Sequence, residues 1–110
     1  MKNFIQPGNV VTLVAPYNLI SGQGALVGAI FGIAATDALQ GTPVEAVRDG
    51  VFVLGAVTAD TLAIGEKVYW DNTARRITKT ATNNVLVGAA AAAKSGTETS
   101  ATVLLDGVIR

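Results

Sequence analysis

The sequence predicts an all-β fold, and three of its features favour that class. Short runs rich in Val, Ile, Leu and Thr are separated by Gly, Asn and Asp, as strands are separated by turns. Two segments have the pattern of β-hairpins, and the apolar, glycine-rich run at residues 25–38 is a poor helix former. Such spacing is typical of a small antiparallel β-sandwich or a partly open β-barrel, and the sequence leaves the choice between them open.

The length and composition favour one domain that hides part of its surface. The chain has 110 residues, and no linker or charge block divides it. We therefore expect a single β domain at residues 9–110 after a candidate N-terminal arm at residues 1–8. Half of the residues are apolar but only 15% are charged, against a typical charged share of about 25%. Such a chain either spans a membrane or buries surface in an assembly.

Membranes and nucleic acids are not expected as partners. A membrane-spanning helix needs about 20 predominantly apolar residues. The longest unbroken apolar run, at residues 25–35, has only eleven. The formal net charge is +0, which gives no electrostatic basis for binding DNA, RNA or an anionic bilayer.

The residue inventory argues against an enzyme. The chain has no His and no Cys, so Ser-His-Asp and Cys-His catalysis and the usual zinc sites cannot be built. The acidic residues are scattered without a close pair, and the glycines at residues 22–32 lack the strand-loop-helix context of a dinucleotide site. We expect no catalytic residue, cofactor or metal. A small-ligand barrel using Tyr17, Trp70 and a carboxylate such as Asp71 is the disfavoured alternative.

Three further segments are expected to be strands. They lie at residues 9–15, at about residues 85–91, and within residues 101–110, where Asp106 and Gly107 form a turn or a bulge. The run of five alanines at residues 89–93 is ambiguous, because alanine favours a helix whereas the preceding Val, Leu and Val favour a strand. Both interpretations stay open at this point.

The pair Asp49–Gly50 predicts the first hairpin. It lies between two β-prone runs, and Asp-Gly is among the strongest short-range signals of a two-residue turn. With these residues as the turn, Val47 faces Phe52 and Ala46 faces Val53.

The segment at residues 65–80 predicts the second hairpin, with its turn at residues 71–74. In this register Trp70 lies opposite Arg75 and Val68 lies opposite Ile77. The Arg75 guanidinium is then expected to lie on the indole of Trp70. We interpret Trp70 as a core or cross-strand anchor in preference to a ligand site.

The glycine spacing predicts a packing surface. Gly24, Gly28 and Gly32 lie an even number of residues apart, so in an extended chain they point to one face. A smooth strip of this kind allows another backbone to approach closely, and we expect that approach to occur between subunits. Gly24, Gly28, Gly32 and Trp70 are therefore the candidate structural packing residues.

The chain contains an ordered set of motifs: "QPG" at Gln6, "APYN" at Ala15, "SGQGALVGAIFGIA" at Ser21, "GTPVE" at Gly41, "GVFVL" at Gly50, "GEKVYWD" at Gly65 and "LVGAAAAA" at Leu86. This set resembles a known family, the capsid cement or head decoration proteins of tailed bacteriophages. The resemblance covers nearly the whole chain, and its most specific elements are the glycine-rich run after "APYN" and the "VYWD" hairpin. The chain departs from the family in its five alanines and in the low charge of its first third.

The resemblance implies a structural virion protein of a phage or prophage. Proteins of this family bind the outside of an expanded icosahedral capsid, commonly as trimers, and stabilise the shell without doing chemistry. The implied partners are the major capsid protein and further copies of the chain, and the implied location is the capsid exterior after synthesis in the bacterial host cytoplasm. The alternative is another virion or tail structural β-module.

Two groups of residues are candidate contacts with the capsid or with a neighbouring subunit. Phe4, Ile5 and Gln6 precede a Pro-Gly break and are suited to an arm that adds a strand to a sheet edge, with a frayed terminus as the alternative. Arg75 and Arg76 are suited to an acidic capsid surface, although a solvated strand face carries such charges routinely.

Overall fold

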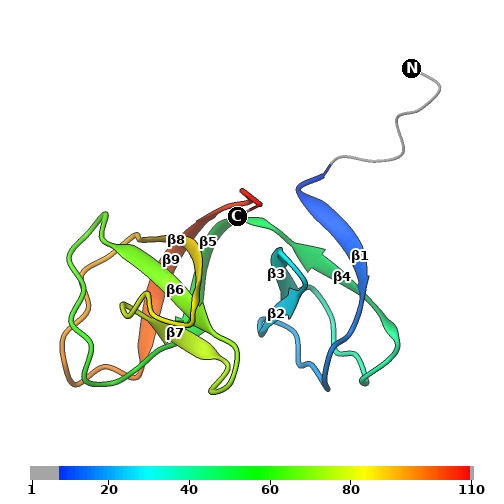
Figure 1. Cartoon of the computed structure of the whole chain (residues 1–110), viewed down its shortest axis with the longest axis horizontal. Helices are drawn as coiled ribbons and strands as arrows, with labels where there is room; N and C mark the ends of the chain where they lie inside the picture. Colours follow the sequence, from blue (N-terminus) through cyan, green and yellow to red (C-terminus); the bar gives the residue numbers. More distant parts are fainter. Residues whose placement is uncertain (1–7, 110) are drawn as a thin grey trace.

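The computed structural model describes residues 8–109 and confirms the all-β class (Figure 1). The described range contains no helix, and therefore none that could span a membrane. It contains nine strands: β1 (Val10–Val14), β2 (Gly24–Val27), β3 (Ile30–Ala34), β4 (Pro43–Val47), β5 (Asp49–Gly55), β6 (Lys67–Asp71), β7 (Arg76–Thr78), β8 (Val85–Ala90) and β9 (Ser100–Asp106).

The first four strands form one antiparallel sheet, in the order β1-β4-β3-β2. The predicted strand at residues 9–15 is present as β1, which pairs along its whole length with β4. Sheet order leaves β1 and β2 as the two edges. This sheet forms the right-hand lobe of Figure 1.

The remaining five strands form a second antiparallel sheet, in the order β5-β9-β8-β6-β7, which curls into a half-barrel. Its two edges approach each other where Ala56, just after β5, makes a parallel bridge to Ile77 in β7. The N–H group of Val57 donates to the carbonyl oxygen of Ile77 at 3.0 Å. The open choice between sandwich and barrel is thus answered by a partly open barrel joined to a separate sheet.

A hydrophobic core fills the half-barrel and continues into the space between the two sheets. Its largest fully buried side chains are Ile77, Leu105, Val68 and Val103. Ile33 of β3, in the other sheet, belongs to the same cluster. Burial of each such side chain contributes about 1.5–3 kcal/mol to the free energy of unfolding. A second cluster belongs to the four-stranded sheet and its loops, and comprises Ala15, Tyr17, Leu19, Ala25, Ala34 and Val44.

The predicted hairpin at Asp49–Gly50 is wrong. Both residues lie within β5, which belongs to a different sheet from β4, so Val47 does not face Phe52. Phe52 pairs instead with Val103 of β9. The chain passes from one sheet to the other without a turn, as Figure 1 shows where β4 runs into β5.

The second pair expected from that hairpin is also absent. Ala46 pairs with Val11 and Ala34 inside its own sheet, and Val53 pairs with Thr102 of β9. The physical reason is that β9 offers β5 seven paired residues. A local hairpin between β4 and β5 would not leave β5 free to form this ladder with β9. The non-local pairing therefore overrides the turn preference of Asp-Gly.

The second predicted hairpin exists as β6 and β7, but its register is shifted. Trp70 lies opposite Ile77, so Val68 does not face Ile77 and Arg75 does not face Trp70. The loop comprises residues 72–75, and Asp71 sets its shape because one carboxylate oxygen accepts the backbone N–H groups of residues 73 and 74 at 3.0 and 3.2 Å. The sequence predicted the hairpin correctly, but the hydrogen bonds of the Asp71 carboxylate favour a different register from the predicted one.

The C-terminal third follows the expected strands. The predicted strand at residues 85–91 is β8, and the alanine run continues it through Ala90 before the chain bends, without a helix. One strand, β9, ends at Asp106, and Gly107 follows it with a φ of 67°.

The glycine strip predicted at residues 24–32 is also wrong. Gly28 has a φ of 58° and, with Ala29, forms the two-residue connection between β2 and β3. The chain therefore reverses between Gly24 and Gly32, which lie on neighbouring strands. An even spacing in sequence gives one common face only when the whole segment is extended, and the turn at Gly28 prevents that.

Candidate binding site between the two sheets

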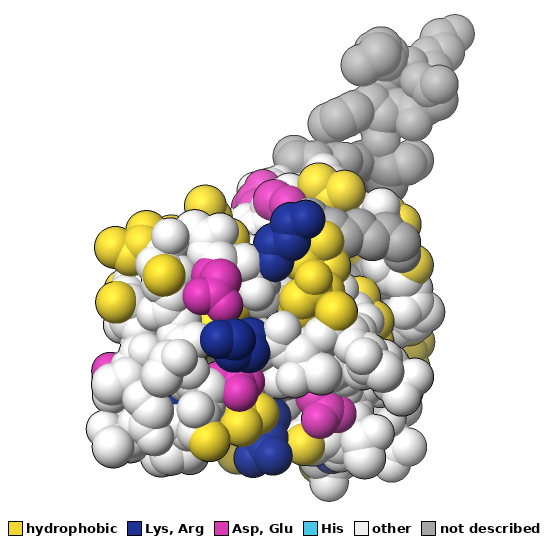
Figure 2. All heavy atoms as spheres, turned by 60° about the vertical axis from the view of Figure 1, so that its left-hand side comes forward, with side chains coloured by type: hydrophobic (Ala, Val, Ile, Leu, Met, Phe, Trp, Pro, Cys, Tyr) yellow, Lys and Arg dark blue, Asp and Glu magenta, His cyan; other side chains and the backbone are white. Residues whose placement is uncertain are grey.

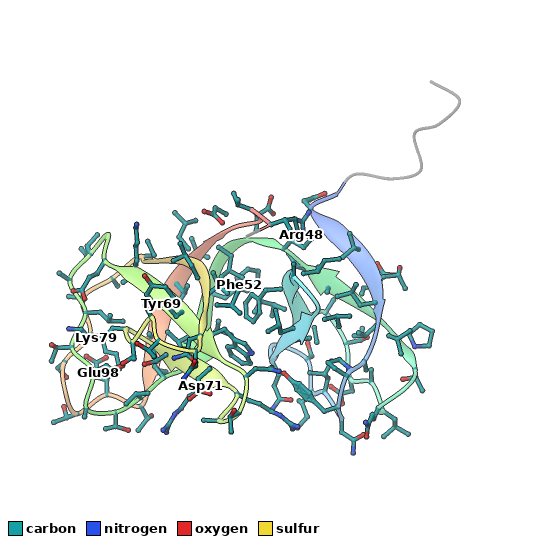
Figure 3. The ribbon with its side chains drawn as sticks, viewed as in Figure 1. Arg48, Phe52, Tyr69, Asp71, Lys79 and Glu98 are labelled. Carbon is teal, nitrogen blue, oxygen red and sulfur yellow. The ribbon has the colours of Figure 1, made fainter. Side chains whose placement is uncertain are left out.

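A cleft of about 280 Å³ lies at the junction of the two sheets. Its lining comes from the loop before β2 and the first residue of β2 on one side, and from β5, β6 and the β6–β7 loop on the other. Figure 3 labels Phe52 and Asp71, whose strands border this junction. The cleft thus exists only because segments from both halves of the chain meet there.

Trp70 forms the inner wall of the cleft. Its side chain is 3% exposed, and its Nε1–H group donates to Oδ1 of Asn72 at 3.0 Å. The indole lies against Phe31 of β3, with ring centroids 5.0 Å apart and an interplanar angle of 49°. This tilted aromatic pair is an attractive geometry that joins the half-barrel to the other sheet.

Gly24 is adjacent to Trp70. A Cβ atom placed on Gly24 would lie 2.8 Å from the indole and 2.9 Å from the ring of Phe31, both shorter than real contacts. Two of the candidate packing residues, Gly24 and Trp70, are therefore in contact within one chain. The absence of a side chain at Gly24 is what lets the aromatic rings approach β2.

The other two candidate glycines lie elsewhere. A Cβ atom on Gly32 would lie 2.9 Å from Cβ of Ala46, so Gly32 allows close packing at β4. A Cβ atom on Gly28 would meet nothing within 4 Å. The three glycines thus have three different surroundings, and they do not form one surface.

Tyr17 and Arg75 form the outer part of the cleft. The Cζ atom of the Arg75 guanidinium lies 3.7 Å from the centroid of the Tyr17 ring. The predicted stacking of Arg75 on the Trp70 indole is therefore wrong, and the aromatic partner is Tyr17. The reason is the hairpin register: Arg75 is a loop residue with a φ of 57°, which directs it away from the β6–β7 ladder.

The Tyr17 phenol is itself fixed in position. Its O–H group donates to the carbonyl oxygen of Gly24 at 2.5 Å, and the side chain is buried. Burial raises the pKa of Tyr17 above its ordinary value of 10.0, and the positive charge of Arg75 opposes part of that rise. The ring is therefore a neutral platform for the guanidinium at physiological pH.

The candidate contact residues are not brought together. Arg75 lines the cleft, whereas Arg76 is an exposed residue of β7 opposite Asp71 and does not line it. Phe4, Ile5 and Gln6, like most of the candidate arm at residues 1–8, lie outside the described residues.

Arg48 is an important residue that sequence reasoning missed. It lies between β4 and β5, and its guanidinium donates to the carbonyl oxygen of Gly8 at 2.6 Å and to that of Gly107. Its backbone N–H group donates to the carbonyl oxygen of Asn9 at 2.7 Å. Arg48 thereby ties the start of the described chain to its end, at the upper side of the molecule in Figure 3. Its place just before the supposed Asp-Gly turn gave no sign of this role.

Lys94 was also missed, because residues 94–100 have the composition of a polar loop. Its side chain is only 4% exposed, and its Nζ atom donates to the carbonyl oxygens of Thr58, Asp60 and Ser95 at 3.0, 2.6 and 3.0 Å. These contacts join two loops at one end of the half-barrel. No local sequence signal distinguishes this lysine from a solvated one.

The outer surface combines mixed charges with exposed apolar side chains. Figure 2 shows Lys, Arg, Asp and Glu side chains of both signs alternating across one face. On the outer face of β5 and β9, Val51 lies directly opposite Leu104, and Val53 is two residues further along the same strand. These three side chains are 59%, 48% and 67% exposed. We call them the β5–β9 apolar patch.

Comparison with known proteins identifies a family. A family model described as phage cement protein matches residues 5–106, which is nearly the whole chain. No curated protein and no solved structure matches the chain.

Proposed function

The chain belongs to the phage cement protein family, and from this premise we propose that it binds the outer surface of an icosahedral phage or prophage capsid. The family name indicates a structural, capsid-stabilising role. The match over residues 5–106 is the observation that carries the proposal. The proposed partner is the major capsid protein, and the proposed location is the exterior of the virion.

The β5–β9 apolar patch supports the proposal. Val51 and Leu104 form a directly opposed cross-strand pair, so their side chains and that of Val53 make a continuous apolar area on a rigid sheet. Exposed apolar areas of this kind often mark interaction surfaces. We propose that this patch is buried when the protein assembles.

The proposed assembly is a homotrimer. Several copies that each bury a modest area on the shell bind together more tightly than any single copy, because the later contacts become intramolecular. The low charged share of 15% agrees with a subunit that conceals part of its surface.

The N-terminal residues provide a second proposed contact. We propose that Phe4, Ile5 and Gln6 add as a strand to a sheet edge of a neighbouring subunit or of the capsid. Arg48 supports this, because its bond to the carbonyl oxygen of Gly8 holds the first described residue in place.

The proposal is tested by co-sedimentation with expanded capsids that lack this protein. We expect saturable binding, a higher capsid disruption temperature, and a trimer mass by light scattering. Replacing both Val51 and Leu104 by Lys should weaken binding, whereas Thr82→Lys, at an exposed position between β7 and β8, should not. A monomer that neither sediments with capsids nor protects them would contradict the proposal. Deletion of residues 2–6 tests the arm separately, and unchanged binding would exclude it.

A further inference from the structure

The polar side chains at the mouth of the cleft are oriented by backbone groups. Oε1 of Gln23 accepts the backbone N–H group of Ile20 at 3.0 Å, and Oδ1 of Asn18 accepts that of Gln40 at 2.8 Å. A backbone N–H group requires an acceptor, so the oxygen of each carboxamide must face it. Each side chain therefore keeps its NH₂ group, which is a pure donor, for other partners.

Arg75 adds a positive charge that has no counterion in the described part of the chain. The ion pair found among residues 8–109 joins Lys79 to Glu66 at 3.5 Å and does not involve Arg75. None of the residues that line the cleft is acidic. The guanidinium is planar and has five N–H donors in its plane. It contacts the Tyr17 ring through its face, so these donors stay available for a ligand.

The arrangement is also fixed before any ligand binds. The Arg75 backbone N–H group donates to the carbonyl oxygen of Asp71 at 2.6 Å, and its side chain lies on a ring that is itself hydrogen-bonded. A preorganised guanidinium loses less conformational entropy on binding than a free one. The cleft thus presents fixed donors, one positive charge and apolar walls.

From this we infer that the cleft receives one carboxylate group, held by the Arg75 guanidinium and the carboxamide NH₂ groups of Asn18 and Gln23. A carboxylate has only acceptor atoms and matches the planar guanidinium in a two-point contact. We assign its source to an Asp or Glu side chain of the capsid subunit, an assignment that rests on the proposed function. Arg76 is not part of this site, because it lies opposite Asp71 on β7.

The first experiment measures capsid binding of the wild type, Arg75→Gln, Arg75→Lys and Arg76→Gln by co-sedimentation. We expect Arg75→Gln to weaken binding about tenfold, as for loss of a charge-assisted hydrogen bond. Arg75→Lys should recover only part of that loss, because lysine lacks the planar fork. Arg76→Gln is the matched control and should stay within about twofold of the wild type. Trp70 fluorescence and circular dichroism verify that each variant is folded. If the wild type binds capsids and Arg75→Gln binds equally well, the inference is overturned while the proposed function stands.

The second experiment tests whether the cleft binds a carboxylate when no capsid is present. Sodium acetate is titrated into the isolated protein at constant ionic strength while NMR follows the Trp70 indole N–H and the Arg75 Nε–H signals, with acetamide as the neutral probe. We expect a saturable shift with acetate, in the millimolar range or weaker, that is absent with acetamide and in Arg75→Gln. If the wild type does not bind capsids but acetate saturates the cleft, the carboxylate site stands and its capsid source is overturned. If it neither binds capsids nor responds to acetate, both the proposed function and the inference fail.

Discussion

The guanidinium of Arg75 lies 3.7 Å above the ring of Tyr17, and the Tyr17 hydroxyl donates to the carbonyl oxygen of Gly24 at 2.5 Å. These contacts form a chain from the β6–β7 loop through a buried phenol to the first residue of β2. The two halves of the protein are therefore linked at the cleft, because Arg75 and Tyr17 lie far apart in sequence.

The Tyr17 phenol makes stability depend on pH at the alkaline end. Burial raises its pKa in the folded state above 10.0, so the folded protein holds the phenol proton more tightly than the unfolded chain. Its contribution is fully present below about pH 10 and is lost as the pH rises through the folded pKa. Urea unfolding at pH 7 to 11 should show that the advantage of wild type over Tyr17→Phe declines above pH 10.

At neutral pH Tyr17→Phe should cost about 1 kcal/mol for the lost hydrogen bond. Tyr69→Phe serves as the control. This variant keeps Tyr17, so its stability advantage over Tyr17→Phe should also decline above pH 10. A constant difference between wild type and Tyr17→Phe across the whole pH range would contradict the assigned cause.

Gly24 should not tolerate even one methyl group. A Cβ atom there would lie 2.8 Å from the Trp70 indole and 2.9 Å from Phe31, so both rings must move. We expect Gly24→Ala to lower the free energy of unfolding by about 1–3 kcal/mol and to change the Trp70 fluorescence. Gly55→Ala is the matched control, since a Cβ atom on Gly55 meets nothing within 4 Å. Equal stability of the two variants would show that the space between Gly24 and the Trp70 indole can accept a methyl group.

The fold class and most strands could be predicted because they depend on local patterns. The apolar runs of β1, β8 and β9 and the hairpin of β6 and β7 are all visible as short β-prone segments. The hairpin predicted at Asp49–Gly50 was wrong because strand pairing is not decided by local patterns alone. Its turn preference is local, whereas the partner of β5 is β9, about half the chain away, and a single sequence carries no direct signal of that pairing.

The cleft was only partly predictable. Tyr17, Trp70 and Arg75 stood out because of their residue types, but their partners could not be read from the sequence. The contact of Arg75 with Tyr17 depends on a loop register that the Asp71 carboxylate sets, and the contact of Gly24 with Trp70 depends on how the two sheets meet. Both are consequences of tertiary structure. Lys94 was missed for the same reason, since its burial depends on the carbonyl groups of Thr58 and Asp60, which lie 36 and 34 residues away in sequence.

Lys94 is expected to be structural. Lys94→Met keeps much of the side-chain volume but leaves the carbonyl oxygens of Thr58, Asp60 and Ser95 without this donor. Loss of the hydrogen bonds donated by this buried ammonium group costs about 1.5–3 kcal/mol in the free energy of unfolding, and urea denaturation measures it. Lys67→Met, at an exposed position of β6, should change stability by less than about 0.5 kcal/mol. If Lys94→Met were as stable as Lys67→Met, the three hydrogen bonds would have no net effect.

We propose that residues 9–110 unfold as one domain, because the core of the half-barrel includes Ile33 and packs against Phe31 of the other sheet. The sheets are coupled at two separate places, by the Phe31–Trp70 pair and by the hydrogen bonds that Arg48 donates to the carbonyl oxygens of Gly8 and Gly107. Urea transitions followed by Trp70 fluorescence, which reports on the junction, and by far-ultraviolet circular dichroism, which reports on all strands, should therefore coincide. Phe31 is partly buried, so Phe31→Ala should destabilise the protein by about 1–3 kcal/mol and lower both midpoints together. Two separated transitions in the wild type would instead mean that each sheet unfolds independently, since a shared core cannot be lost from one sheet alone.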